Sequence, residues 1–191
     1  MTKHRDHTRV LIYSHDSFGL GHLRRCRTIA HHLVERHKDM SVLILSGSPI
    51  IGSFDFRARV DFVRIPGVIK LRNGEYTSLK LPLAIEQTMA MRAAIIRHTA
   101  ESFAPDLFLV DKEPLGLRGE VRETLTYLND RGVPCILGLR DVMDDPVSLE
   151  DLDEHLHAQV ALWHAVVRLV GLLHLLLIGL RLYKQFTGER R

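Results

Sequence analysis

Hydrophobic and polar positions alternate along most of the chain in a way that predicts successive strands and helices. Four short apolar runs, at residues 8–15, 41–46, 106–111 and 133–139, predict strands, and the alternating segment 60–65 predicts another. Apolar positions spaced three to four residues apart predict helices over three segments: residues 23–36, 82–103 and 119–131. The polar segment 68–81 predicts an irregular surface loop.

This alternation of strands with helices predicts an α/β fold. Short connections and nearly unbroken apolar strands are typical of a parallel sheet with helices on both faces and right-handed crossovers. The expected strand order is 3-2-1-4-5, which is a Rossmann-like arrangement. In such a sheet the ligand lies beyond the carboxyl ends of the strands where the order reverses, here strands one and four.

The character of the chain changes after Pro146. Residues 148–154 are acidic, and residues 160–180 contain only one full charge, Arg168. We therefore expect an α/β domain over residues 1–146, followed at 147–191 by an acidic linker and an apolar C-terminal helix.

Three interpretations of this tail stay open. Its 21 apolar-dominated residues could span a bilayer, but the basic residues that follow would then lie on the outer side, against the positive-inside tendency. It could instead lie on a membrane surface or pack against a partner, because His157, His164 and Arg168 share one helical face. It could also be non-native sequence from a truncated or shifted reading frame.

Composition narrows the class of protein. The content of 46% hydrophobic residues indicates a globular chain, and 26 Lys and Arg against 23 Asp and Glu leave it only slightly basic. Scattered basic residues and 6% aromatics argue against nucleic-acid binding. Two cysteines are too few for a disulfide scaffold, and the polar N-terminus lacks a signal-peptide core. We expect a cytoplasmic protein, which the second interpretation of the tail would place at the inner face of the plasma membrane.

The strongest local signal is the loop between the first strand and the first helix. It reads SHDSFGLGHLRR and contributes the candidate ligand contacts Ser17, Gly19, Leu20 and Gly21. Glycines let backbone amides approach a phosphate or sugar, and the helix dipole favours negative charge there. His22 is a candidate base or phosphate donor. Arg24 stands where a dinucleotide-binding loop has its third glycine, which argues against nicotinamide binding; a purely structural turn is the alternative.

Other polar residues are expected near the same edge of the sheet. Asp16, the second catalytic candidate, could orient His22 or an acceptor hydroxyl, although aspartate is equally common in caps and turns. Further candidate contacts to the donor phosphate or the acceptor are Arg25, Lys112, Glu113, Arg140 and Asp141. A surface salt bridge is the alternative for Lys112. We expect no metal, because the acidic residues around Asp141 are better explained by a solvated loop.

Several motifs carry a family resemblance. The run FGLGHLRRCRTIA at residues 18–30 resembles the family 28-like nucleotide-sugar glycosyltransferases and the UDP-sugar hydrolase of pseudaminic acid synthesis. The hydrolase also has an arginine-cysteine pair similar to Arg25-Cys26. Residues 13–25, 106–120 and 137–146 resemble a group of predicted bacterial glycosyltransferases. The similarity spans about residues 9–146.

This resemblance implies a glycosyltransferase-B fold, in which two Rossmann-like domains face each other. The first domain would bind the acceptor and contribute the glycine loop, and the second would hold most of the nucleotide. The resemblance places His22 as base or donor organiser and Gly19 and Gly21 near the diphosphate, with no protein nucleophile and no cofactor. The donor-binding domain is missing from this chain, so we expect a truncated N-terminal half.

The expected function is hexosyl transfer from a nucleotide-diphosphate sugar to the hydroxyl of an acceptor glycan or lipid. Two alternatives stay open: a non-catalytic acceptor-binding or membrane-associated subunit that acts with a separate donor-domain partner, and a nucleotide-sugar hydrolase. Whether this chain alone is an enzyme also stays open.

Overall fold

The structure of the protein, a computed structural model, describes residues 7–16 and 20–139. The chain divides into two compact units, Met1–Arg140 and Asp141–Arg191, and all described residues belong to the first. The expectations for Ser17, Gly19, Arg140, Asp141 and the apolar tail lie outside the described residues. Within the described ranges no helix is long and apolar enough to cross a membrane.

A five-stranded parallel sheet forms the centre of the described unit, in the order β3-β2-β1-β6-β7. Its strands are β1 (Thr8–Ser14), β2 (Met40–Ser46), β3 (Val60–Arg64), β6 (Leu107–Asp111) and β7 (Cys135–Gly138). Because β6 and β7 are the fourth and fifth predicted strands, this order confirms the predicted Rossmann-like arrangement.

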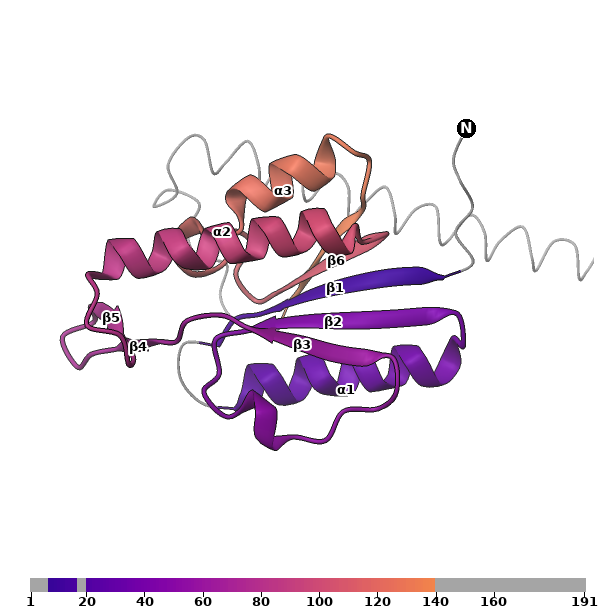
Figure 1. The fold of residues 1–191 in the computed structure, drawn as a ribbon, viewed down its shortest axis with the longest axis horizontal. Helices are drawn as coiled ribbons and strands as arrows, with labels where there is room; N and C mark the ends of the chain where they lie inside the picture. The colour runs from indigo at the N-terminus through magenta and orange to yellow at the C-terminus, as the bar shows by residue number, and fades with distance from the viewer. Residues whose placement is uncertain (1–6, 17–19, 140–191) are drawn as a thin grey trace, which may run out of the picture. The chain divides into compact units, whose positions relative to one another are not determined.

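Three α-helices cover the sheet: α1 (Gly21–Arg36), α2 (Ile85–Phe103) and α3 (Arg122–Asn129). Figure 1 shows α1 on one side of the strands and α2 with α3 on the other. The predicted helices are all confirmed, each within three residues of its expected ends. α2 ends at Phe103. The capping residue Ala104 takes a left-handed conformation with its amide bonded to Ala100 O, and Pro105 then prevents continuation.

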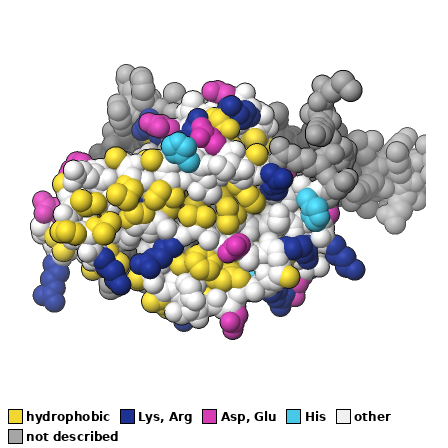
Figure 2. All heavy atoms as spheres, viewed as in Figure 1, with side chains coloured by type: hydrophobic (Ala, Val, Ile, Leu, Met, Phe, Trp, Pro, Cys, Tyr) yellow, Lys and Arg dark blue, Asp and Glu magenta, His cyan; other side chains and the backbone are white. Residues whose placement is uncertain are grey.

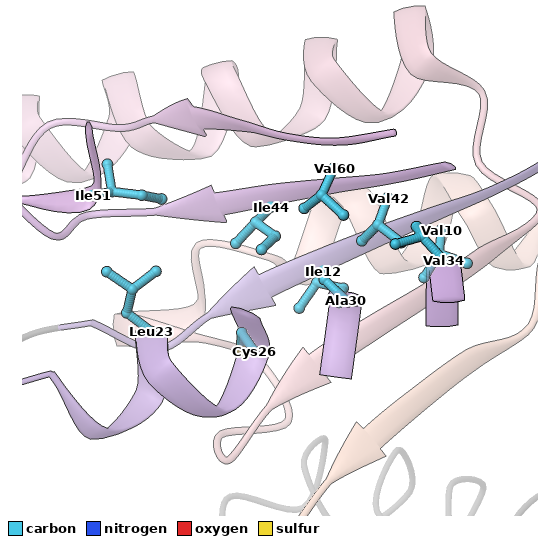
Figure 3. Packing of buried hydrophobic residues seen from close by; sticks show 10 residues of the cluster. All are labelled: Val10, Ile12, Leu23, Cys26, Ala30, Val34, Val42, Ile44, Ile51 and Val60. Carbon is cyan, nitrogen blue, oxygen red and sulfur yellow. The ribbon is translucent and has the colours of Figure 1, made fainter. Parts of the chain in front are cut away.

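A hydrophobic cluster lies between α1 and the strands β1 to β3. Leu23, Cys26, Ala30 and Val34 recur every three to four residues on α1 and are all buried. Figure 3 shows them facing the side chains of β1 and β2, among them Ile12. The periodicity that predicts the helix therefore also identifies the face that packs on the sheet.

The expectation for residues 68–81 was wrong in part, because this segment contains a β-hairpin. Strands β4 (Val68–Lys70) and β5 (Tyr76–Ser78) pair antiparallel, and Gly74 in the turn has φ +89°. Each strand is only three residues long and half of the segment is exposed, so neither alternation nor an apolar run announces it.

Two single-turn 3-10 helices complete the described unit. They are η1 (Ile51–Ser53) and η2 (Leu117–Gly119). The left-handed conformation of Arg118 inside η2 separates it from α3, which explains why α3 begins later than the predicted residue 119.

One face of α2 is apolar towards solvent. Figure 2 shows hydrophobic side chains gathered in a band across the viewed surface, over the region of α2. Met91 on α2 is 40% exposed, and Leu71 and Leu81 around the hairpin are 44% and 45% exposed. The helix therefore packs on the sheet through Ile96 and Ala100 while it presents other apolar groups outward.

Candidate active site

The candidate site lies where the strand order reverses, between the carboxyl ends of β1 and β6. In a parallel sheet of this kind the crossovers on the two sides of this point run in opposite directions, which leaves room for a ligand above the strand ends. His15 and Asp16 follow β1 directly, Lys112 and Glu113 follow β6, and α1 begins at Gly21. The fold therefore brings together segments that lie about ninety residues apart in the sequence.

The described residues supply no side-chain cap for the N-terminus of α1. Leu20 occupies the capping position without a side-chain hydrogen bond, and the first turn contains no acidic residue. A Cβ built on Gly21 would meet no atom within 4 Å, and the backbone there does not have a positive φ. Neither packing nor conformation within the described chain thus explains a glycine at this position.

His22 is held by a buried carboxylate on the neighbouring strand. Its Nδ1 lies 2.6 Å from Oδ2 of Asp111, the last residue of β6. Oδ1 of the same carboxylate accepts a hydrogen bond from a terminal nitrogen of Arg25, one turn further along α1. Asp111 is 2% exposed, His22 13% and Arg25 29% by side chain, so the carboxylate is buried beneath two groups that reach the surface.

This geometry defines what His22 can do chemically. When Nδ1 carries the proton and donates it to Asp111, Nε2 has a free lone pair and can accept a proton from a substrate. An imidazole oriented in this way by a carboxylate is the arrangement of a general base, and the carboxylate also stabilises the imidazolium that forms. The arrangement can thus deprotonate a hydroxyl group.

Asp16 is engaged with the neighbouring strand β2 and not with His22. Its Oδ2 accepts a hydrogen bond of 2.5 Å from Ser46 Oγ, which in turn accepts one of 3.1 Å from the amide of Ser48. Hence the carboxylate that contacts His22 belongs to Asp111, whereas Asp16 was one candidate for this role in the sequence analysis. Asp16 Oδ1 has no hydrogen-bond partner among the described residues, and a contact to an acceptor hydroxyl stays a prediction.

Lys112 and Glu113 lie where predicted but interact mainly with each other. Lys112 Nζ is 3.6 Å from Glu113 Oε1, with both side chains near 40% exposed, so this pair adds little stability. Lys112 takes a left-handed conformation with φ 66°, which strains a non-glycine residue immediately after Asp111. Their predicted contacts to a donor or acceptor remain predictions.

His15 is a further histidine of the site that the sequence analysis did not select. It is 7% exposed, its Nδ1 has no hydrogen-bond partner in the described part of the chain, and its ring centroid lies 5.7 Å from that of His22. Burial lowers the pKa of His15, and this effect outweighs the charge of Glu113, which acts in the opposite direction. At neutral pH the His15 side chain is therefore uncharged, and it lies beside His22 in the site.

The lowered pKa of His15 predicts that acid destabilises the fold. Below a pH of about 6.5 the unfolded chain binds a proton at residue 15 that the folded chain resists, so this contribution to stability is lost as the pH falls from 6.5 towards the lowered value. Urea unfolding of the wild type and of His15→Leu at pH 7.5 and 5.5 measures this loss of stability. The variant should lose less stability between the two pH values, whereas the exposed control His32→Leu should keep the wild-type difference. Equal pH dependence in His15→Leu would contradict the expectation.

A buried ion pair beneath the site is the largest feature that the sequence analysis missed. Arg92 of α2 donates two hydrogen bonds of 2.5 Å to Glu120, and both side chains are fully buried. Tyr13 of β1 donates a third to Glu120 at 2.6 Å. Burial and the charge of Glu120 raise the pKa of Tyr13 well above its usual value, so the phenol stays protonated. The network joins β1, α2 and the segment before α3.

The same arginine fixes the backbone next to the site. Arg92 also donates to Pro66 O at 2.6 Å. A Cβ at Gly47, which follows β2, would lie 2.7 Å from Arg92 Nη1 and 3.1 Å from Asp16 O, so a larger residue there would displace the guanidinium. The signal that could have revealed this arginine is its place in a buried stripe of α2, with Thr88 and Ile96 four residues away on either side.

Comparisons with known proteins report similarity of structure only. No family model and no curated protein matches the chain. A ugt transferase from Siraitia grosvenorii in complex with UDP aligns with a TM-score of 0.44 and 16% identity over 68% of this chain and 27% of its own. A UGT protein from Medicago truncatula complexed with UDP-glucose aligns with a TM-score of 0.44 and 12% identity over 80% and 37%. The chain thus spans about a third of the length of either protein. At this level of similarity, neither assigns a family or a substrate to it.

Proposed function

We propose that this chain forms the histidine-bearing half of a glycosyltransferase that moves a sugar from a nucleotide diphosphate to an acceptor hydroxyl. The observation that carries the proposal is the hydrogen bond of 2.6 Å between His22 Nδ1 and Asp111 at the reversal point of the sheet. It orients a base at the position where this class of sheet binds ligands. The sequence motif around His22, which resembles nucleotide-sugar glycosyltransferases, supports the same reaction.

The proposed reaction is a transfer between two oxygens. As the acceptor oxygen bonds to the anomeric carbon of the sugar, the bond from that carbon to the diphosphate oxygen breaks, and the nucleotide diphosphate leaves with the bonding electrons. His22 Nε2 takes the proton of the acceptor hydroxyl, and Asp111 stabilises the resulting imidazolium. The N-terminus of α1, which lies at this point of the sheet, favours negative charge nearby, such as that of the diphosphate.

Two further parts of the proposal concern a second domain and the side of the site that receives the acceptor. We assign most of the nucleotide contacts to a second domain, and an acceptor glycan or lipid to the side of Asp16 and His22. The loop residues Ser17 and Gly19 would contribute amides or hydroxyls next to Gly21.

Gly21 offers a direct test of ligand approach. Because a Cβ at Gly21 contacts nothing within 4 Å, Gly21→Ala should leave the free energy of unfolding within about 0.5 kcal/mol of wild type. If a phosphate or sugar approaches the helix amides closely, the added methyl group should weaken its binding about tenfold or more. Binding is measured by titrating the full chain with UDP-sugars, GDP-sugars and free sugar acceptors. The readout is the change in the amide NMR signals of residues near Gly21 and Lys112.

A second glycine serves as the matched control. Gly52→Ala in η1 also meets only ordinary contact, with Phe62 Cζ at 3.8 Å, and it lies outside the proposed site, so it should bind like wild type. If these ligands bind Gly21→Ala as well as Gly52→Ala, the proposal fails. Release of nucleotide diphosphate without any acceptor would instead indicate the hydrolase.

A further inference from the structure

Arg25 occupies a position that suits it for a role other than ligand contact. It lies three residues after His22 on the same face of α1, and both side chains reach Asp111. Each oxygen of the carboxylate therefore has its own donor: Oδ2 accepts from His22, and Oδ1 accepts from Arg25. The helix and the end of β6 are joined through this one side chain.

The charges of the three groups decide the state of the imidazole. A carboxylate that is 2% exposed and lacks a counter-charge strongly favours a proton on an adjacent imidazole, because the resulting ion pair relieves its burial. An imidazolium cannot accept a proton from a hydroxyl. Arg25 carries a permanent positive charge, so Arg25 and Asp111 together are neutral and His22 has no need to be protonated.

The other charged groups around His22 do not replace Arg25. From the end of β1, His15 is buried with a lowered pKa and is neutral, and Asp16 is bonded to Ser46. From the segment after β6, Lys112 and Glu113 pair with each other, and at about 40% exposure their charges largely cancel and are screened. Among the described residues, Arg25 is the permanently charged group that contacts Asp111 directly.

We propose that Arg25 is a positioning residue that acts through Asp111 to keep His22 neutral, with its proton on Nδ1. The proposal rests on the proposed function only in that His22 is the base. It replaces the sequence-based assignment of Arg25 as a contact to the donor or acceptor.

The test reads the imidazole nitrogens directly. Long-range proton–nitrogen NMR of the full chain, labelled with ¹⁵N-histidine and recorded at pH 7, distinguishes a nitrogen that carries a proton from one that accepts; the His22→Gln variant identifies the signals of His22. In wild type, Nδ1 should be of the donor type and Nε2 of the acceptor type. In Arg25→Gln, Nε2 should move to the donor type, as in an imidazolium.

Two further variants separate the specific contact from its alternatives. Arg24→Gln removes the same charge from the adjacent, exposed position on α1 and should leave the His22 signals unchanged. Arg25→Lys keeps the charge and should keep Nε2 of the acceptor type, which answers the question even if Arg25→Gln does not fold. Each of three results would overturn the proposal: an acceptor-type Nε2 in folded Arg25→Gln, the same change of the His22 signals in Arg24→Gln, or a donor-type Nε2 in Arg25→Lys. Because no substrate is present, the result is independent of whether the chain binds nucleotide sugars.

Discussion

Replacing Asp111 by asparagine is expected to reduce sugar transfer by about 10²- to 10⁴-fold in the intact enzyme that carries this domain. The amide has nearly the same shape as the carboxylate, but its nitrogen donates hydrogen bonds. An asparagine that donates to His22 Nδ1 would force the imidazole proton onto Nε2, where it faces the acceptor and blocks proton transfer. The loss should appear in kcat more than in KM, since ground-state contacts to the sugars are unchanged. Steady-state release of nucleotide diphosphate with and without acceptor measures both parameters.

A second aspartate on the same strand segment provides the control. Asp106 precedes β6 at its other end, where it is exposed and accepts a hydrogen bond of 2.8 Å from the amide of Arg9. Asp106→Asn should therefore retain wild-type kcat. Removal of the base itself in His22→Gln should match the loss in Asp111→Asn to within about tenfold, because the two residues act as one unit. Near-normal turnover in either Asp111→Asn or His22→Gln would remove the base from the proposed mechanism.

Replacing Arg92 by methionine is expected to lower the free energy of unfolding by about 3–5 kcal/mol. Methionine has a similar volume, so little cavity results, but the carboxylate of Glu120 would lose its counter-charge at 0% side-chain exposure. Burial alone would lower the pKa of Arg92, yet the hydrogen bonds and charge of Glu120 outweigh it and raise the pKa, which shows how closely the two groups depend on each other. Urea unfolding at pH 7 measures the change.

The stability lost in Arg92→Met should be recovered when its partners are also made apolar. In the triple variant Arg92→Met, Glu120→Leu, Tyr13→Phe, no charge of the network is left without a partner, and the amide of Leu117, which donates to the Tyr13 hydroxyl at 3.1 Å, is the group that loses its acceptor. Replacement of whole buried ion pairs is often neutral or stabilising, so most of the loss should return. Two results would contradict this expectation: a loss below about 1 kcal/mol in Arg92→Met, or a triple variant that is less stable than Arg92→Met. Either would show that the uncompensated charge of Glu120 is not what destabilises the single variant.

The sheet could be predicted from the sequence because its signals are local. Most strands of the main sheet are apolar runs, while β3 alternates apolar and charged residues. The helices between them carry their buried positions at regular spacing, as at Leu23, Cys26 and Ala30 on α1. Alternation of the two kinds of segment then restricts the topology to very few orders. The short hairpin at β4 and β5 escaped this reasoning because its pairing depends on a turn at Gly74 and not on any apolar pattern.

The contacts within the site depend on distances that no local pattern contains. The sequence identifies His22 and places Asp16 and Asp111 at the ends of adjacent strands, but the direction of α1 decides which carboxylate meets the imidazole. Likewise, the arginine in the buried stripe of α2 could have been noticed, whereas its partner Glu120 lies 28 residues later in an irregular segment. Such pairs are set by tertiary packing alone.

The central position of β1 also determines when the site can come into existence during synthesis. β1 to β3 and α1 are complete within the first 64 residues, yet β1 pairs on its other side with β6, and Arg9 bonds to a residue 97 positions later. Until β6 leaves the ribosome, the nascent chain carries an apolar strand with one unpaired edge, the kind of surface on which chains aggregate. The arrival of Asp111 therefore closes this edge and delivers the partner of His22 in the same step.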